Sequence, residues 1–341
     1  MPKNHLKVYL SDTFDPWFNL ATEDWIFREM DPEQQVLFLW RNSETVVIGR
    51  FQNPWTECNT ALMEKDGVKL ARRQSGGGAV FHDLGNTNFT FMSSKKSYDK
   101  SINNKIITNA LKAFDVDAYP SGRNDILIDD KEGAKKISGS AFKEAKDRSF
   151  HHGTLLIDAN LSKLGNYLNP HKKKLVSKGI SSVRSRVADL VEHAPELNHD
   201  LLCAQIIKEF HKNYDNECPV EMLNFDSLKS IPALNSYYEK LKDWNWRFGE
   251  TPKFNHQMYE RFEWGAMEVH LDSHKGIIER AQIFSDSLHP EMIDYLTQSL
   301  KGKTYDSSGV KSACLEVKNE LPMISDEIVE FQDWLTAQIQ G

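Results

Sequence analysis

Alternating polar and apolar residues on both sides of a run of three glycines predict strands that flank a loop. Val68, Leu70 and Arg72 alternate with the residues between them, which places these three side chains on one face of the strand before the glycines. Arg73 then falls on the opposite face. We therefore expect Arg73 to contact a ligand and Arg72 to form a structural ion pair.

Helix and strand patterns are interspersed along the first two thirds of the chain. Apolar residues spaced at a period near 3.6 predict helices, and alternating or continuous apolar runs predict strands. The predicted helices cover residues 15–26, 54–65 and 99–114, and the predicted strands cover residues 36–40, 45–50, 79–82, 87–92, 126–128, 136–142 and 150–158. This order is typical of an α+β domain with mixed sheets and flanking helices.

The last third of the chain predicts a second, smaller α+β domain. Residues 224–232 predict a loop, and Trp244 opens a segment of short strands. Further strands are predicted at 267–271 and 277–284, and helices at 290–300 and 326–340. We place the boundary between residues 245 and 252, which predicts domains at 1–246, with a core at about 31–218, and at 247–341.

Composition narrows the class of protein. The 341 residues are 40% hydrophobic and 27% charged, which is typical of a globular protein of about two domains. No apolar run reaches the roughly 20 residues of a membrane span, and no signal-peptide pattern opens the chain, so we expect a cytoplasmic protein. A net charge of −7 argues against nucleic-acid binding, and four scattered cysteines predict neither disulfides nor a zinc site. Without an evident apolar heptad or strand edge, we expect a monomer.

One segment is strongly basic, although the net charge of the chain is negative. Residues 171–186 carry six lysines and arginines and no acidic residue: Lys172, Lys173, Lys174, Lys178, Arg184 and Arg186. Either the segment is solvated surface, or it docks a phosphate or an acidic partner.

The run of three glycines predicts a loop that binds an anion. Glycine lacks Cβ and permits positive φ, so the N–H groups of Gly76, Gly77 and Gly78 can converge on an anion, and nearby arginines supply forked donors. The run matches neither a P-loop nor a Gly-x-Gly-x-x-Gly motif. A flexible hairpin tip is the alternative interpretation.

A second candidate site lies on the predicted strands at 136–142 and 150–158. Alternation puts Ile137, Gly139 and Ala141 on one face, and it puts Lys136, Ser138 and Ser140 on the other. Lys135 would share the apolar face, so Lys136 is expected to point into a polar cleft unless both lysines merely solubilise a strand end. His151 and His152 must point to opposite faces, and their spacing alone does not choose between them.

Together these motifs resemble the lipoate-protein ligase A family in its bacterial two-domain form. Residues 72–86, 121–125, 136–141 and 151–155 occur in the family's order and approximate spacing, and the resemblance extends from residue 12 through 186 into the C-terminal domain. It implies a biotin/lipoate ligase-like catalytic domain with mixed β-sheets and flanking helices, followed by a small α+β accessory domain.

The resemblance also implies a two-step reaction. Lipoate would attack the α-phosphate of ATP in the presence of magnesium, giving lipoyl-adenylate and pyrophosphate. A specific lysine would then accept the lipoyl group with release of AMP. The implied acceptors are the lipoyl domains of 2-oxoacid dehydrogenase E2 subunits and the glycine cleavage H protein.

Carried over by motif, the implied catalytic residue is Lys136, which would bridge the acyl oxygen and the α-phosphate. The implied ATP-binding residues are Arg73, Gly78, Ala79, Val80, Phe81 and Lys136. The implied lipoate-binding residues are Lys136, Ser75, His82 and His152, with Asn86 as a further lining residue. Asp125 is a candidate partner for magnesium or for the incoming amine.

Three rival functions remain open on the sequence. An octanoyl or lipoyl transferase needs a reactive cysteine, and none lies between Cys58 and Cys203. Biotin ligases usually carry more arginine–glycine alternation in the glycine motif. A non-catalytic lipoate or nucleotide binder is disfavoured by the presence of Lys136 and of a second domain.

Overall fold

The computed structural model describes residues 5–122, 124–131, 133–168, 187–248 and 256–340. The chain forms two compact units. Unit 1 holds residues 1–48, 54–74 and 79–247, and unit 2 holds residues 49–53, 75–78 and 248–341. The three glycines therefore pack with the C-terminal part of the chain. Arg123 and the basic segment 172–186 lie outside the described residues.

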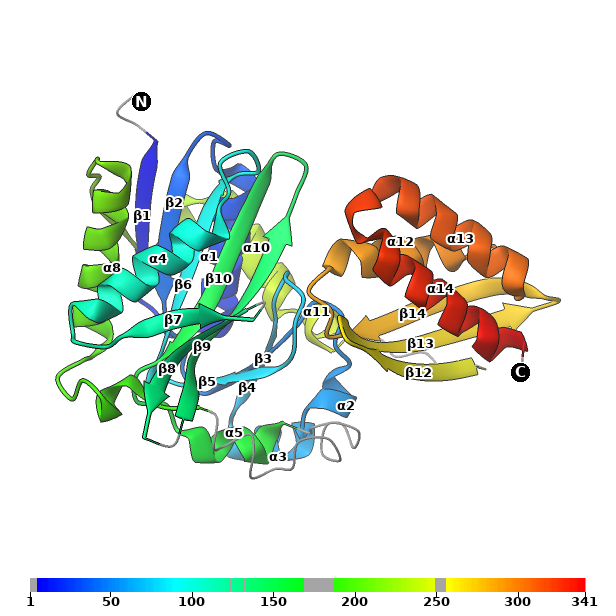
Figure 1. Ribbon diagram of the computed structural model, residues 1–341, viewed down its shortest axis with the longest axis horizontal. Helices are drawn as coiled ribbons and strands as arrows, with labels where there is room; N and C mark the ends of the chain where they lie inside the picture. Colours follow the sequence, from blue (N-terminus) through cyan, green and yellow to red (C-terminus); the bar gives the residue numbers. More distant parts are fainter. Residues whose placement is uncertain (1–4, 123, 132, 169–186, 249–255, 341) are drawn as a thin grey trace. The chain divides into compact units, whose positions relative to one another are not determined.

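The main sheet of unit 1 is mixed. Its described strands are β1 (Leu6–Ser11), β2 (Gln35–Trp40), β6 (Asn86–Ser94), β7 (Ala118–Ser121), β8 (Asp125–Asp130), β9 (Gly133–Glu144), β10 (Arg148–Leu156) and β11 (Val220–Leu223). They lie in the order β11-β1-β2-β6-β10-β9-β8-β7 (Figure 1). Strand β1 pairs in parallel with β2 and β11, and the other neighbours pair in antiparallel fashion.

A smaller sheet in unit 1 carries the strands on both sides of the glycines. It contains β3 (Thr45–Ile48), β4 (Lys69–Arg72) and β5 (Val80–His82), in the order β4-β3-β5. Val46 of β3 pairs with Leu70 on one side and with Phe81 on the other. The chain between β4 and β5 therefore has to cross from one edge of this sheet to the other.

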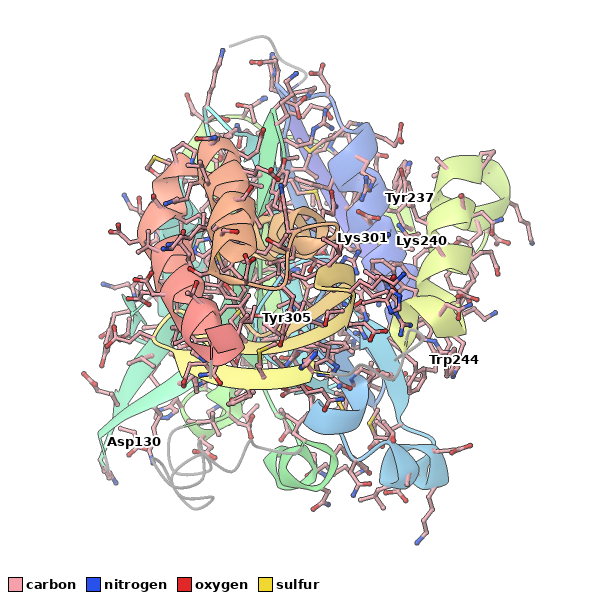
Figure 2. The ribbon with its side chains drawn as sticks, turned by 90° about the vertical axis from the view of Figure 1, so that its right-hand side faces the viewer. Asp130, Tyr237, Lys240, Trp244, Lys301 and Tyr305 are labelled. Atoms are coloured by element: carbon pink, nitrogen blue, oxygen red, sulfur yellow. The ribbon has the colours of Figure 1, made fainter. Side chains whose placement is uncertain are left out.

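Helices cover both faces of the main sheet. The described helices of unit 1 are α1 (Pro16–Glu29), α2 (Pro54–Glu57), α3 (Thr60–Asp66), α4 (Lys100–Lys112), α5 (Leu161–Tyr167), α8 (His199–Tyr214), α9 (Ser227–Ser230), α10 (Pro232–Lys242) and α11 (Trp244–Arg247). Helices α4 and α8 pack on one face, and α1 and α10 pack on the other (Figure 1). Figure 2 labels Tyr237 and Lys240 on α10, and Trp244, where α11 begins, lies below them in this view.

Unit 2 is a three-stranded antiparallel sheet with helices on one face (Figure 1). Its elements are β12 (His256–Phe262), β13 (Gly265–His274), β14 (Ile277–Ser285), α12 (Pro290–Leu300), α13 (Ser307–Glu320) and α14 (Ser325–Gln340). Phe51, far away in sequence, belongs to its hydrophobic core. The carbonyl oxygen of Phe51 accepts from the N–H of Ser285 at 2.7 Å, which ties segment 49–53 to β14.

The interspersed helices and mixed sheets confirm the α+β class, but three element predictions are wrong. The helix predicted at 54–65 is two helices, because the side chain of Asn59 caps a new helix by accepting from Leu62 N at 3.2 Å. The loop predicted at 224–232 contains α9, and Trp244 begins helix α11 instead of a strand.

Candidate active site

The two arginines at the end of β4 make different contacts. The guanidinium of Arg72 donates to the carbonyl oxygens of the last two residues of α11, at 2.9 Å each. Arg73 is buried and donates to the carbonyl oxygen of Val47 at 3.2 Å. Burial lowers the pKa of Arg73 to about 10, and the carboxylate of Glu23 opposes the shift. Main-chain carbonyl oxygens thus hold Arg72, and the ion pair expected for it stays a prediction. Arg73 places a buried cation near Glu23.

The glycine segment makes main-chain contacts inside unit 2. The N–H of Gly77 donates to the carbonyl oxygen of Ser287 at 3.0 Å, with a φ of +89° at Gly77. A Cβ on Gly76 would lie 2.0 Å from the same oxygen, and a Cβ on Gly49 would lie 2.2 Å from the oxygen of Gly77. The interpretation that all three glycine N–H groups converge on an anion is thus wrong for Gly77. A Cβ on Gly78, by contrast, would meet nothing within 4 Å.

A buried polar cluster lies between α1 and the main sheet of unit 1. The Nδ1 atom of His152 lies 2.8 Å from a carboxylate oxygen of Glu23, which also accepts from the hydroxyl of Thr90 at 2.6 Å. The indole N–H of Trp40 donates to the same hydroxyl at 3.3 Å. These contacts fix the orientation of His152 and bring α1, β2, β6 and β10 to one point.

The neighbouring His151 faces the opposite side of the sheet, among aromatic rings. Its ring is stacked on Phe142, with 4.9 Å between centroids, and meets Phe89 edge-on at 5.4 Å. Complete burial lowers the pKa of His151 to about 3. The sequence left the choice between the two histidines open, and the structure places His152 in the polar cluster and His151 in the apolar core.

His82 and Asn86 bring unsatisfied buried groups toward the same cluster. The side-chain amide of Asn42 donates to Nδ1 of His82 at 3.2 Å, so the proton of the neutral ring is on Nε2. Burial, with the charges of Arg73 and His152, lowers the pKa of His82 to about 3. Among the described residues, Nε2 of His82 and Oδ1 of Asn86 have no hydrogen-bond partner. Buried polar groups normally have partners, so these two atoms are suited to bind a ligand.

Lys136 and Asp125 form an ion pair on adjacent strands. The Nζ atom of Lys136 lies 2.6 Å from Oδ1 of Asp125, and the two side chains are 35% and 34% exposed. The pairing of β8 with β9 shifts its register here, so that Ile126 faces Ser138 and Leu127 faces Lys136. The residue between them, Ile137, is an extra residue in β9 and forms a β-bulge.

This bulge overturns the predicted face of Lys136. Its ammonium lies 2.9 Å from where a Cβ of Gly139 would be, so Lys136 and Gly139 share a side of the sheet. Ser138 lies opposite Ile126, whose side chain belongs to the hydrophobic core on the other side. The grouping of Lys136 with Ser138 and Ser140 is therefore wrong, because strict alternation fails across a bulge. Lys135 lies opposite Ile128 and is buried, as predicted.

The buried cluster and the ion pair lie along one face of the main sheet. His152 pairs with Ala141 of β9, and the hydroxyl of Thr154, two residues further on, accepts from the N–H of Gly139 at 3.2 Å. Gly139 in turn lies beside Lys136. The site thus has a buried end at His152 and a partly exposed end at Lys136.

Other predicted residues lie elsewhere. Ser75 is buried in unit 2, and its carbonyl oxygen accepts from the N–H of Arg50 at 2.9 Å. The ring of Phe81 is stacked on Tyr167, with 5.6 Å between centroids. This packing leaves the main chain of β5 as the part of Phe81 suited to a ligand.

Sequence reasoning missed Glu23, Thr90, Trp40 and Asn42. Glu23, Trp40 and Thr90 sit in segments whose apolar pattern predicted a core helix or strand, and Asn42 lies between two predicted strands. A signal was present in α1, where Asn19 and Glu23 lie four residues apart within an otherwise largely apolar buried stretch. Buried polar residues with that spacing share a helix face and need partners.

Comparisons with known proteins first define the class. The family described as lipoyl protein ligase A/B catalytic domain matches residues 15–211, and the bacterial lipoate protein ligase C-terminus matches residues 251–335. The lipoate-protein ligase A of Psychrobacter cryohalolentis is 52% identical to this chain over 98% of it and 99% of that protein. The chain belongs to the lipoate-protein ligase family.

Solved structures agree with this membership. P. falciparum LipL1, in complex with lipoate, has a TM-score of 0.83 at 34% identity, over 95% of this chain and 99% of that chain. A lipoate-protein ligase A bound with ATP has a TM-score of 0.59 at 25% identity, over 71% of this chain and 98% of that one. The bi-partite ligase of Thermoplasma acidophilum, described together with its E2 lipoyl domain, has a TM-score of 0.63 at 26% identity, over 73% and 98%. These neighbours confirm the predicted catalytic fold.

None of the helices in the described part of the chain is both long and apolar enough to cross a membrane. In the same part of the chain, no group of three or more His, Cys, Asp or Glu side chains is arranged to hold a metal ion. A magnesium ion bound mainly through phosphate oxygens and water needs no such group. The contact predicted between magnesium and Asp125 stays a prediction.

Proposed function

We propose that this chain ligates lipoate to a specific lysine of an acceptor protein in two steps. Lipoate attacks the α-phosphate of ATP, giving lipoyl-adenylate and pyrophosphate, and the acceptor amine then attacks the mixed anhydride and releases AMP. Family membership and the lipoate- and ATP-bound relatives support ATP-dependent ligation. Both steps concentrate negative charge, which cationic and N–H donors stabilise in the transition state.

The placement of Lys136 is the observation that carries the proposal. Its ammonium is partly exposed, lies over Gly139 and shares a sheet face with the buried cluster around His152. An ammonium has three donors, so Lys136 can hold an acyl oxygen and a phosphate oxygen while it keeps Asp125. We assign Lys136 as the catalytic residue, acting on both ligands.

The buried end suits the acyl group. We propose that His82, His152 and Asn86 line the lipoate site, with Nε2–H of His82 as a donor and Oδ1 of Asn86 as an acceptor. Ser75 is kept as a lipoate contact on the motif alone. Arg73 lies near His82, as its effect on the pKa of that histidine indicates, and this position suits the junction between acyl group and phosphate.

The remaining assignments concern the nucleotide. We propose that Arg73 contacts phosphate and that Gly78, Ala79, Val80 and Phe81 contact ATP through their main chains. Magnesium would enter with ATP and neutralise part of its triphosphate charge.

For the acceptors we propose the lipoyl domains of 2-oxoacid dehydrogenase E2 subunits and the glycine cleavage H protein, supported by the E2 lipoyl domain described with the archaeal relative. We further propose that a monomer acts in the cytoplasm.

The alternative function is an octanoyl or lipoyl transferase that acts through an enzyme cysteine. The properties of the thiols in this chain disfavour it. Burial raises the pKa of Cys58, Cys203 and Cys314 to about 12, and it also raises the pKa of Cys218. A thiol with a raised pKa carries less thiolate at neutral pH and is a poorer nucleophile. The four cysteines of this chain therefore lack the microenvironment that such a transferase requires.

The proposal is tested by mass spectrometry of an unmodified E2 lipoyl domain after incubation with the protein, lipoate, ATP and magnesium. We expect one lipoyl group on one lysine, formed only when ATP is present. Modification from an acyl carrier protein without ATP would instead establish a transferase. No modification under either condition, by a protein that binds lipoate, would establish a binding module.

A further inference from the structure

The ion pair at the exposed end of the site constrains where an acceptor amine can enter. Nζ of Lys136 and Oδ1 of Asp125 are 2.6 Å apart. Two oxygens that each lie within about 3 Å of the same nitrogen are at most about 6 Å apart. If Lys136 holds the acyl oxygen of the adenylate, as the proposed function states, the carboxylate of Asp125 lies within that distance of it. An attacking nitrogen, at about 3–3.5 Å from the acyl carbon, fits in the same space.

The exposed fractions of the side chains also indicate that an acceptor lysine enters at the Lys136 end of the site. The side chains of Lys136 and Asp125 are 35% and 34% exposed, whereas those of His152 and Glu23 are 9% and 2% exposed. An acceptor lysine arrives on the surface of another protein and can reach only the exposed end. Asp125 is the carboxylate that it meets there beside the catalytic ammonium.

We infer that Asp125 is a catalytic residue of the second step and accepts a proton from the acceptor lysine. The lysine arrives as an ammonium and loses its first proton to water. The lone pair of the amine then attacks the acyl carbon, the new C–N bond forms, and the second proton passes to Asp125. The bond between the acyl carbon and the phosphate oxygen breaks, AMP leaves with its electron pair, and Asp125 returns the proton to water.

The test measures the two steps separately on Asp125→Asn, which keeps the size of the side chain and an oxygen that can accept from Lys136. The first step is measured as lipoate-dependent pyrophosphate exchange. The second is measured as single-turnover transfer from enzyme-bound lipoyl-adenylate to an unmodified E2 lipoyl domain. The matched control is Asp129→Asn, on the same strand, where the exposed carboxylate accepts from the hydroxyl of Tyr119 at 2.7 Å.

We expect the ratio of transfer to exchange to fall about 100-fold or more in Asp125→Asn, the usual scale of a lost general base, and to stay at the wild-type value in Asp129→Asn. An equal fall in exchange and transfer would show that Asp125 only positions Lys136. Transfer at the wild-type rate would overturn the inference outright, and absence of exchange in the wild type would instead contradict the proposed function.

Discussion

The Nζ atom of Lys136 lies 2.9 Å from the position that a Cβ atom would take on Gly139. The missing side chain at Gly139 thus leaves the space that the ammonium fills, and the bulge at Ile137 turns Lys136 toward that space. Sheet irregularity and a glycine together place the ammonium of Lys136 beside Asp125.

Replacing Lys136 with alanine should remove catalysis without removing the fold. The side chain is partly exposed and contributes little to the core, whereas loss of a preorganised donor typically costs at least about 100-fold in rate. The measurement is pyrophosphate exchange together with thermal unfolding. Lys131→Ala, at an exposed position of the turn between β8 and β9, is the control and should keep full exchange. Near-normal exchange by a folded Lys136→Ala protein would remove Lys136 from the mechanism.

Gly139→Ala should displace the ammonium of Lys136 instead of deleting it. Because the new methyl group meets the flexible end of a lysine, the cost in stability should be small. A displacement of about 1 Å at a reacting centre can lower the rate about 100-fold. The Gly139→Ala protein should therefore lose pyrophosphate exchange while its melting temperature stays nearly unchanged. Equal activity in Gly139→Ala and in Gly165→Ala, where a Cβ meets open space, would contradict the account.

Gly76→Ala should destabilise unit 2. The added Cβ would lie 2.0 Å from the main-chain oxygen of Ser287, which cannot move as a side chain can. Overpacking of this kind costs about 1–3 kcal/mol. Denaturant unfolding of the full chain should show this loss for Gly76→Ala and little change for Gly78→Ala, where a Cβ has room. Equal stabilities would mean that the contact with Ser287 is not maintained in solution.

Stability should fall as the pH drops below the ordinary pKa of histidine. The pKa values of His151 and His82 are lowered from 6.5 to about 3 by burial, so between these limits the unfolded chain binds protons that the folded chain does not. The stability is fully present above pH 6.5, and each histidine removes up to about 1.4 kcal/mol per pH unit below it. His151→Phe, a ring of similar size in an aromatic surrounding, should reduce this slope in urea titrations at several pH values. Parallel pH profiles for the two proteins would refute this origin of the acid sensitivity.

Much of the fold follows from apolar periodicity, and its misses have identifiable causes. The predicted helix at 290–300 and the strands around the glycines agree with α12, β4 and β5. Helices α8, α10 and α13 were not predicted, although the sequence carries the signal: their buried apolar residues have helical spacing, at Leu202, Ile206 and Phe210 in α8, Leu234 and Leu241 in α10, and Val310, Cys314 and Val317 in α13. The break between α2 and α3 depends on the cap of Asn59, and a capping residue inside a helical pattern is easily taken as helix interior.

The sequence predicts the site residues that belong to a continuous motif. It does not predict the site residues that the fold brings in from distant segments. Lys136 and His152 stand in recognisable motifs, whereas Glu23 reaches the same cluster from α1 and is placed there by its contacts with His152 and Thr90. The faces of β9 could not be assigned because a bulge depends on the partner strand, which the sequence of β9 does not contain.

The central claim is that this chain activates lipoate as an adenylate, and pyrophosphate exchange tests it most directly. The purified protein is incubated with labelled pyrophosphate, ATP and magnesium, with and without lipoate and without any acceptor. The account predicts that label enters ATP only when lipoate is present. No exchange by a folded protein would contradict it and would direct the search toward a carrier-dependent transferase or a non-catalytic binder.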